Sequence, residues 1–419
     1  MTATTSGWFG LAPRDSAEPH RAATPLELLF DLTVVVAVAQ AAAELHHALS
    51  AGDVVAGAAR YTMVFFAIWW AWMNFTWFAS AYDRDDVTYR LLTLVQLGGA
   101  LLIAAGIPAA FEHTDFRTVT VGYTVMRVAL VVQWLRAAAG DPVRRPVALA
   151  YAAGITVVQL GWLARLLLPH PDAPPALVAF LLLVAAEIAV PVVAERRATS
   201  TAWHPGHIAE RYSLFTLIVL GECILACTVT LQRAVTDVGL SVSAVVVAVS
   251  SVLVVFCLWW VYFEDDVAAG LRTAPQESFR WGYAHFAVFA GVAAVGAGLQ
   301  VAAEHVTATT ATDSAGSGQA PEAAHGIGAL GVGLSVAVPV AVVLVVLAAL
   351  HNRLDTVQVP VVLWAGSGLV VLGCGLAATA VPVTVSVAGT ALVCVAVVVV
   401  KVVARSRPDL VYRSRTVRP

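Results

Sequence analysis

The segment TPLELLFDLTVVVAVAQAA at residues 24–42 decides the fold, because it is long and apolar enough to cross a bilayer as a helix. It nevertheless contains Glu27 and Asp31, one helical turn apart near its start, and Gln40 deep inside it. Polar and ionisable groups are costly in hydrocarbon, so within a membrane helix they usually face the protein interior and often mark function. The segment therefore predicts a membrane helix with a polar face.

Composition extends this prediction to the whole chain. Of the 419 residues, 59% are hydrophobic and 12% are charged, and the mean hydropathy is +0.82. A soluble protein has about twice that share of charged residues. The five cysteines all lie inside apolar runs, where small buried residues are expected rather than disulfides. We predict an all-α polytopic membrane protein with the lipid bilayer as its partner, and the absence of a basic domain excludes nucleic-acid binding.

Twelve transmembrane helices are predicted from the apolar runs. Nineteen of the 24 Lys and Arg residues fall on one side of their alternation and four on the other. Cytoplasmic segments are enriched in these residues, so both termini are expected inside. The abundance of Arg, Ala, Val and Gly suggests a bacterial genome, hence the inner membrane. The expected helices are 25–49, 61–82, 91–111, 118–137, 146–167, 175–194, 208–231, 241–263, 281–303, 326–350, 357–379 and 382–403.

The two halves of the chain echo each other. FFAIWWAWMNFTWFASAYDRDD ends the second predicted span and VFCLWWVYFEDD ends the eighth, while AAFEH and VAAEH close the third and ninth. Two units of six helices would keep the same orientation and form parallel repeats, which often hold a pathway between them; duplication without a transport role is the alternative. The expected organisation is an arm 1–23, a first repeat 24–200, a second repeat 201–403, a mobile outer loop 304–325 and a basic tail 404–419.

Helix capping explains one of the two acids in the opening segment. Thr24 fits an N-cap, Pro25 the first helical position, and Glu27 the residue that reaches back to the cap. Capping leaves Asp31, one turn deeper, unexplained. Gln40 is expected either in an interhelical hydrogen bond or in a polar pathway.

Three ionisable residues, Arg127, Glu187 and Glu222, lie near the middle of predicted spans. Arg127 can neutralise one carboxylate, which leaves the other to be protonated, hydrated or bound to a cation. Such an acid suits a proton or cation pathway. The alternative for either acid is a protonated side chain that is hydrogen bonded across helices.

Further polar residues lie at span ends and among aromatic residues. The DRDD (83–86) and EDD (264–266) sequences put acids at helix C-termini, where they oppose the helix dipole and suggest either a cation or a basic partner such as nearby arginines. The Trp-rich stretches are partly interfacial belts. Asn74 lies inside the first of them, and His285 is either titratable near neutral pH or packed. No sequence motif for a cofactor, a metal site or a catalytic nucleophile is present, so none is predicted.

Several stretches resemble the bacterial low temperature requirement protein A family. They are TPLELLFDLTVVVAVAQ, WWAWMNFTWFASAYDRDD, HIAERYSLFTLIVLGECILA and WWVYFEDD, and the likeness runs in detail from about residue 22 to 300. A shorter likeness, Phe30 before Asp31, is to the two-repeat lysosomal potassium channels. At Cys223 the family typically has Ser, which puts a polar contact beside Glu222 in doubt. The resemblance supplies no activity, and it places signature polar residues at Glu27, Asp31, Gln40, Asp83, Asp86, Glu210, Arg211, Glu222 and His285.

Three functions are compatible with these residues. The first is a cation- or proton-coupled transporter of a small substrate, whose pathway residues are Asp31, Gln40, Asn74, Arg127, Glu187, Glu222 and His285. A second set belongs to the inner face: Glu27, Asp83, Asp86, Glu210, Arg211 and Asp266. The second function is a membrane-embedded enzyme acting on a lipid or small apolar molecule, with Glu222 and His285 as acid and base. The third is a structural or regulatory membrane protein. The sequence does not indicate the oligomeric state.

Overall fold

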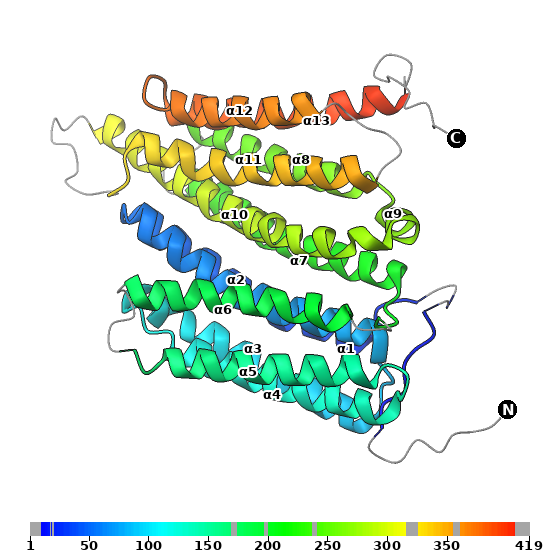
Figure 1. Ribbon diagram of the computed structural model, residues 1–419. Coiled ribbons are helices and arrows are strands. Elements are labelled where there is room, and N and C mark those ends of the chain that lie inside the picture. The colour runs from blue at the N-terminus through cyan, green and yellow to red at the C-terminus, as the bar shows by residue number, and fades with distance from the viewer. Residues whose placement is uncertain are drawn as a thin grey trace. The chain divides into compact units, whose positions relative to one another are not determined.

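The protein was analysed as a computed structural model, which describes residues 10–16, 18, 21–168, 174–196, 200–236, 241–315, 326–354 and 361–406. Within these ranges all regular structure is helical (Figure 1), which confirms the predicted all-α class. The helices are α1 (Pro25–Ser50), α2 (Val54–Tyr82), α3 (Val87–Glu112), α4 (Arg117–Gly140), α5 (Arg145–Arg165), α6 (Pro174–Glu195), α7 (Pro205–Thr236), α8 (Val242–Phe263), α9 (Val267–Thr273), the 3-10 helix η1 (Pro275–Glu277), α10 (Ser278–Ala315), α11 (Ala329–Leu354), α12 (Val361–Ala377) and α13 (Val383–Ser406).

Each predicted span overlaps one long helix. Eleven helices in the described part are long and apolar enough to cross a membrane, and α12, with 17 residues, is shorter. The protein is thus a multi-pass membrane protein. The sequence did not predict the short α9, which begins where Asp266 accepts a hydrogen bond from the N–H of Ala269. Residues 316–325 of the predicted outer loop and 407–419 of the predicted tail lie outside the described ranges.

Local side-chain chemistry sets several helix starts. At α1, Thr24 N–H donates to Glu27 Oε2 at 2.8 Å and Glu27 N–H donates to Thr24 Oγ at 3.3 Å, which is a reciprocal capping box. Asp86 caps α3 by accepting from Tyr89 N–H, and Ser241 caps α8 by accepting from Ala244 N–H.

The chain forms two compact units. The first unit comprises residues 1–41 and 60–212, and the second comprises residues 42–59 and 213–419. The predicted six-helix repeats stay a prediction.

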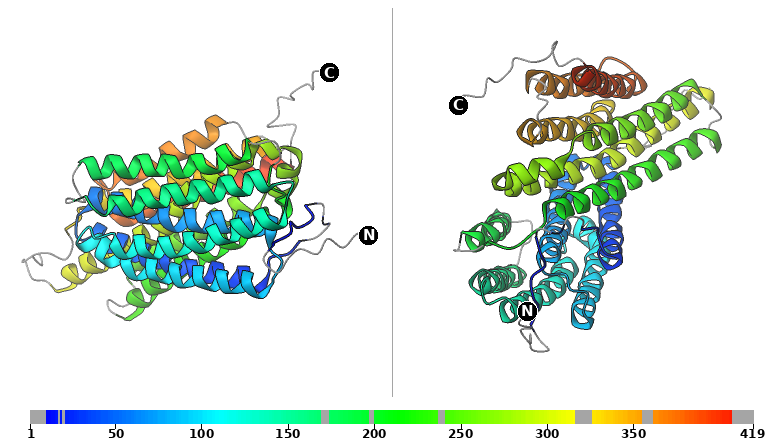
Figure 2. Two further views of the ribbon diagram at one scale, coloured as in Figure 1. Left: turned by 60° about the horizontal axis from the view of Figure 1, so that its bottom comes forward. Right: turned by 90° about the vertical axis from the view of Figure 1, so that its right-hand side faces the viewer.

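In the first unit, α3, α4, α5 and α6 pack side by side in chain order (Figures 1 and 2). On α6, Phe180, Glu187 and Pro191 are buried, whereas Leu181 and Leu182 are exposed. The buried three share one helical face because their spacings are seven and four residues. This helix thus turns a polar group inward and leucines outward, as expected in lipid.

The described part of the N-terminal arm makes hydrogen bonds to the helices. Leu11 N–H donates to Arg136 O at 3.0 Å, and Arg14 N–H donates to Ala81 O at 2.9 Å. Arg21 is 5% exposed and donates to Ser80 O and, at 2.6 Å, to Ala79 O. These carbonyls lie in the last turn of α2, where arginine side chains satisfy helix C-termini.

In the second unit, α11 packs against both α10 and α12, and α13 packs against α8. At the end of α8, Lys401 Nζ of α13 lies 3.1 Å from Glu264 Oε2 and 3.2 Å from Asp265 Oδ2, and Arg405 contacts the same two acids. The basic partner suggested by the EDD sequence is therefore another helix of the same chain.

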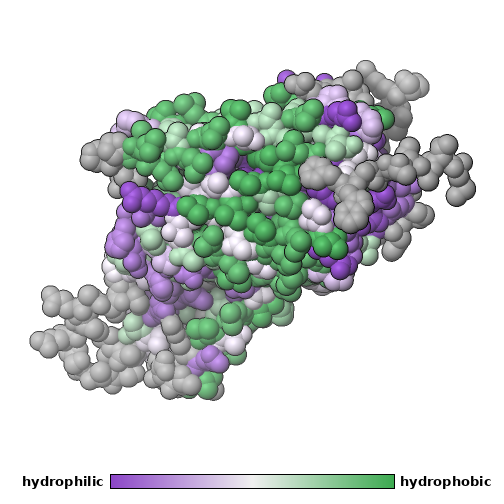
Figure 3. Space-filling view, turned by 90° about the horizontal axis from the view of Figure 1, so that it is seen from below, coloured by the Kyte–Doolittle hydropathy of each residue, from purple (hydrophilic) through white to green (hydrophobic). Residues whose placement is uncertain are grey.

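Large apolar side chains are exposed along many helices, as expected for surfaces that face lipid. Figure 3 shows that hydrophobic residues cover the middle of one face, while hydrophilic residues gather toward its ends. Trp259 and Trp260 are about half exposed, which fits an interfacial position. Trp70 and Trp72, predicted partly as belt residues, are instead fully buried.

Candidate functional site

The α1–α7 cluster, comprising Glu27 and Asp31 of α1 with His207 and Arg211 of α7, lies in the first unit. All four side chains are fully buried. His207 Nε2 lies 3.1 Å from Glu27 Oε1, Arg211 Nη1 lies 3.4 Å from the same oxygen, and Arg211 Nη2 lies 2.5 Å from Asp31 Oδ1. The two acids are one turn apart on α1, and the two bases are one turn apart on α7. Because both spacings are four residues, each acid on α1 lies opposite a base on α7.

Aromatic residues enclose the cluster. Trp72 Nε1 donates to Asp31 Oδ1 at 2.7 Å, and the Tyr212 ring packs edge-on against Trp72 with centroids 4.9 Å apart. Phe30 stacks on Phe75 at 3.9 Å between centroids. The ion pairs therefore lie in apolar surroundings, where electrostatic interactions are strong.

Several polar atoms of the α1–α7 cluster lack a hydrogen-bond partner in the described part of the chain. They are Glu27 Oε1, Asp31 Oδ2, His207 Nδ1, and Arg211 Nε and Nη1, of which Glu27 Oε1 and Arg211 Nη1 lie 3.4 Å apart as an ion pair. A buried polar atom without a partner costs about 1–3 kcal/mol. The cluster thus retains capacity to bind a proton, a water molecule or another polar species.

A second cluster, which we call the Glu187 cluster, surrounds the mid-span Glu187 of α6. Its carboxylate accepts from Tyr123 Oη at 2.7 Å, Trp70 Nε1 at 2.8 Å and Trp162 Nε1 at 3.1 Å, and it is ion-paired with Arg127. Arg127 Nη2 also donates to Tyr123 Oη at 2.6 Å. Both oxygens of Glu187 are thus well supplied with donors from α2, α4 and α5.

Glu222, the mid-span acid of α7, has a different environment in the second unit. It is half-buried, and no residue in the described part gives it a hydrogen bond or an ion pair. The neighbouring Cys223 donates from Sγ to Val292 O at 3.0 Å, so a polar contact persists at the position where the family typically has Ser. Glu222 is therefore an ionisable residue within a membrane-spanning helix, and its carboxylate is available to bind a proton or a cation.

Both ring nitrogens of His285 are engaged. Nδ1 lies 2.7 Å from Trp281 O and Nε2 lies 3.1 Å from Tyr262 Oη. Because a carbonyl can only accept, Nδ1 carries a proton, and Nε2 pairs with the tyrosine hydroxyl. The ring also packs against Trp281 and Phe289. His285 lies in a packed aromatic environment, the second of its two expected alternatives.

The remaining predicted pathway residues are dispersed. Asn74 is buried and donates from Nδ2 to Trp70 O at 2.8 Å, one turn earlier on α2. Gln40 is half-buried and has an interaction partner.

The predicted inner-face acids have separate roles. Asp86 pairs with Arg136 at 2.8 Å besides capping α3, Asp266 caps α9, and Glu210 is half-buried. Asp83 is buried, and burial together with the nearby Glu27 charge raises the pKa of Asp83 to about 6. The structure thus groups Glu27, Asp31 and Arg211, and Asp83 lies near enough to Glu27 for their charges to interact.

Sequence reasoning missed His207 and the aromatic donors Trp70, Trp72, Tyr123 and Trp162. His207 carried a usable signal, because it stands four residues before Arg211 in HIAERY and so shares its helical face. The donors carried none, because the sequence does not distinguish an aromatic side chain that faces the protein interior from one that faces lipid or an interfacial belt.

Comparisons with known proteins agree with the sequence resemblance. The sequence profile described as "Bacterial low temperature requirement A protein (LtrA)" matches residues 22–404. A protein of Rhizobium meliloti (strain 1021), described as uncharacterized, is 26% identical over 292 residues, which cover 67% of this chain and 69% of the relative. The profile match spans both units and every described helix. The chain therefore belongs to the bacterial low temperature requirement A family.

Proposed function

We propose that this protein is a proton- or cation-coupled carrier of the bacterial inner membrane, with both termini cytoplasmic, and that the α1–α7 cluster binds the coupling ion. The observation that carries the proposal is a charge imbalance. Two buried carboxylates, Glu27 and Asp31, share one guanidinium, that of Arg211. The fourth member, His207, is neutral or positive depending on one proton.

Because the cluster is buried, gaining or losing the proton of His207 changes its free energy strongly. An uncompensated charge in a low-dielectric interior costs several kcal/mol. The cluster therefore reaches neutrality by holding a proton, on His207 or on a carboxylate, or by binding a cation. The nearby Arg21 and Asp83 have opposite charges, so together they leave this balance unchanged. A buried group that exchanges one proton or cation is what an ion-coupled carrier needs.

The Glu187 cluster serves as the contrast. Its carboxylate and guanidinium balance one to one, and three further donors complete the carboxylate shell. Arg127 Nε and Nη1 have no hydrogen-bond partner in the described part of the chain, but the carboxylate is fully supplied with donors and the pair is charge-balanced, so it has no need of another ion. We therefore assign Glu187 and Arg127 to holding α2, α4, α5 and α6 together rather than to relaying ions.

Glu222 is the second proposed ion-binding group. It follows Arg211 by 11 residues on α7, which is about 16 Å and three turns, so both side chains project from the same face of this helix. An ionisable residue within a membrane span is a functional candidate by default. Glu222 supports the proposal because no described residue forms a hydrogen bond or an ion pair with its carboxylate.

Ion flux in proteoliposomes tests the proposal. Wild type, Asp31→Asn and Glu222→Gln would be reconstituted with a pH-sensitive and a potassium-sensitive dye. Asp85→Asn is the matched control, because Asp85 is an exposed acid paired with Arg90 at 2.6 Å. We expect wild type and Asp85→Asn to conduct protons or potassium, and the other two variants to lose about tenfold or more, equivalent to about 1.4 kcal/mol. Unchanged flux in a folded Asp31→Asn variant, or no flux in wild type, contradicts the proposal.

The alternatives make different predictions. An enzyme using Glu222 and His285 would turn over substrate in detergent, where no gradient exists; the engaged ring nitrogens of His285 give that reading little support. A purely structural role predicts that Glu222→Gln is tolerated while Glu222→Lys misfolds.

A further inference from the structure

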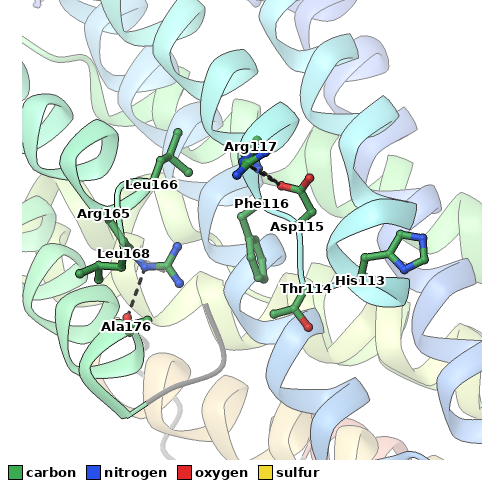
Figure 4. A pocket seen from close by; sticks show the side chains of 9 residues that line it. All are labelled: His113, Thr114, Asp115, Phe116, Arg117, Arg165, Leu166, Leu168 and Ala176. Atoms are coloured by element: carbon green, nitrogen blue, oxygen red, sulfur yellow. Dashed lines mark hydrogen bonds and ion pairs between the residues drawn. The ribbon is translucent and has the colours of Figure 1, made fainter. Parts of the chain in front are cut away.

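A cavity of about 310 Å³ opens where α3 ends, α4 begins, α5 ends and α6 begins in the first unit (Figure 4). It lies apart from the α1–α7 cluster and from the Glu187 cluster, and the proposed transport function does not use it. Its lining combines Arg117 and Arg165 with apolar side chains, including Phe116, Leu166 and Leu168.

Arg165 is the central feature of this cavity. It is 9% exposed, and its Nε donates to Ala176 O at 3.3 Å. Its guanidinium carbon lies 5.6 Å from the ring centroids of Phe116 and Phe180. The Nη2 atom is buried without a hydrogen-bond partner, and no carboxylate in the described ranges forms an ion pair with Arg165. A buried guanidinium with an unused donor at a cavity wall is suited to an anion.

The start of α4 adds to the positive potential. Phe116 is the N-cap residue and provides no side-chain hydrogen bond, while helix N-termini attract anions. Asp115 also lines the cavity, but its Oδ1 accepts from Arg117 N–H at 2.9 Å and lies 4.0 Å from Arg117 Nε. Asp115 thus offsets part of the Arg117 charge, while no carboxylate in the described ranges offsets the charge of Arg165.

The sequence supplies an independent reason to notice this pair. Arg117 and Arg165 are two of the four arginines that the predicted topology places outside, and they are 48 residues apart. The outer side of an inner-membrane protein is poor in arginine. Convergence of two such arginines on one cavity is unexpected for topology determinants, which need no common location.

We propose that this cavity binds a phosphate-type anion, held by the Arg165 guanidinium with help from Arg117 and the start of α4. A phospholipid headgroup and a free phosphate share this chemistry. Leu166 and Leu168 beside Arg165 (Figure 4) would also accommodate the apolar part of a lipid.

The test uses the full chain in phosphatidylcholine nanodiscs and follows its thermal unfolding midpoint. In one arm inorganic phosphate is titrated against chloride of equal ionic strength; in the other, phosphatidylglycerol replaces part of the lipid without free phosphate. We expect a saturable rise of the midpoint in the arm that matches the natural source, because a ligand that binds the folded state stabilises it. The absence of a saturable rise in both arms overturns the proposal.

Variants locate the binding site. Arg165→Gln is expected to weaken apparent affinity about tenfold or more, and Arg165→Lys, which keeps the charge but loses the planar donor fork, to weaken it less. The matched control Arg272→Gln changes an exposed arginine on α9 and is expected to bind as wild type. If Arg165→Gln does not fold, Arg165→Lys decides. Wild-type affinity in Arg165→Lys and in Arg117→Gln overturns the proposal.

Discussion

Glu187 and Asp31 are both buried acids, but they differ in their hydrogen-bond partners and counter-charges. Each is ion-paired with an arginine and accepts from a tryptophan. Glu187 uses both oxygens and has its own counter-charge, whereas Asp31 shares Arg211 with Glu27 and leaves one oxygen without a hydrogen bond among the described residues. The first arrangement favours rigidity and the second favours exchange of a proton or ion.

Removal of Arg127 tests the structural side of this contrast. Arg127→Met leaves the Glu187 carboxylate buried without its counter-charge, so we expect the free energy of unfolding to fall by about 3–5 kcal/mol. The double variant Arg127→Met, Glu187→Leu should recover most of that loss. Equilibrium unfolding of detergent-solubilised protein, followed by circular dichroism, measures both. The control Arg90→Gln breaks an exposed pair and should cost far less; equal stability of Arg127→Met and wild type would contradict the assignment.

Asp83 predicts a pH dependence of stability. Its pKa in the folded protein, raised by burial and by the Glu27 charge, is about 6, against an ordinary value of 3.8. The folded state therefore holds this proton more tightly than the unfolded state, and the associated stability is present below about pH 4 and lost as the pH rises through about 6. Asp83→Asn keeps an acceptor for Asp85 N–H, which donates to Oδ1 at 3.0 Å.

We therefore expect Asp83→Asn to be more stable than wild type at pH 7, by an upper limit of about 3 kcal/mol for two pKa units. The difference should shrink toward pH 4. Thermal midpoints of both proteins between pH 4 and 8 would show it, and parallel profiles for the two proteins would rule it out.

At the scale of elements, glycines set how closely α3 and α4 approach. A Cβ added at Gly99 would lie 2.6 Å from Met126 Cγ and 2.7 Å from Gly122 O, whereas one added at the adjacent Gly98 would meet nothing within 4 Å. Small residues allow membrane helices to pack closely where no hydrophobic force drives them together. The contact between α3 and α4 thus depends on one of two neighbouring glycines.

The two glycines form a matched pair of variants. Gly99→Ala should lower the free energy of unfolding by about 1–3 kcal/mol through overpacking. Gly98→Ala should be neutral or slightly stabilising, because alanine favours the helical conformation. Unfolding of both variants in the same detergent measures the difference. Equal free energies of unfolding for the two variants would contradict the prediction, because they would mean that α3 and α4 can move apart without loss of stability.

Hydropathy predicted the elements well, because each membrane helix must by itself be long and apolar. It did not predict α9, whose start depends on a side-chain cap rather than on apolar length. Depth in the membrane singled out Arg127, Glu187 and Glu222, and Asp31 stood out because helix capping did not explain it. Neither observation indicated which partner each has, since the pairing of Asp31 with Arg211 joins residues 180 positions apart.

At the scale of the whole molecule, the number of crossings is the testable quantity. Eleven described helices are long enough to span a membrane, and α12 has 17 residues, which at 1.5 Å each is about 25 Å and near the lower limit of a bilayer core. If α12 crosses, the count is even and both termini lie on the same side.

Reporter fusions decide between these topologies. Green fluorescent protein fused after Pro419 is expected to be fluorescent, and alkaline phosphatase fused at the same position to be inactive, because the basic tail is expected in the cytoplasm. The reverse pattern would place the C-terminus outside and, with a cytoplasmic N-terminus, require an odd number of crossings.

Lys401 is the one lysine of the sequence, and it lies 5% exposed between Glu264, Asp265 and the ring of Trp364. Amine-selective reagents need access to the lysine nitrogen, which these acids and the aromatic ring cover. Acylation of Lys401 should therefore proceed only as fast as α13 detaches from the end of α8. The acylation rate of this one lysine thus reports how often α13 opens. Peptide mass spectrometry can measure it without an engineered label.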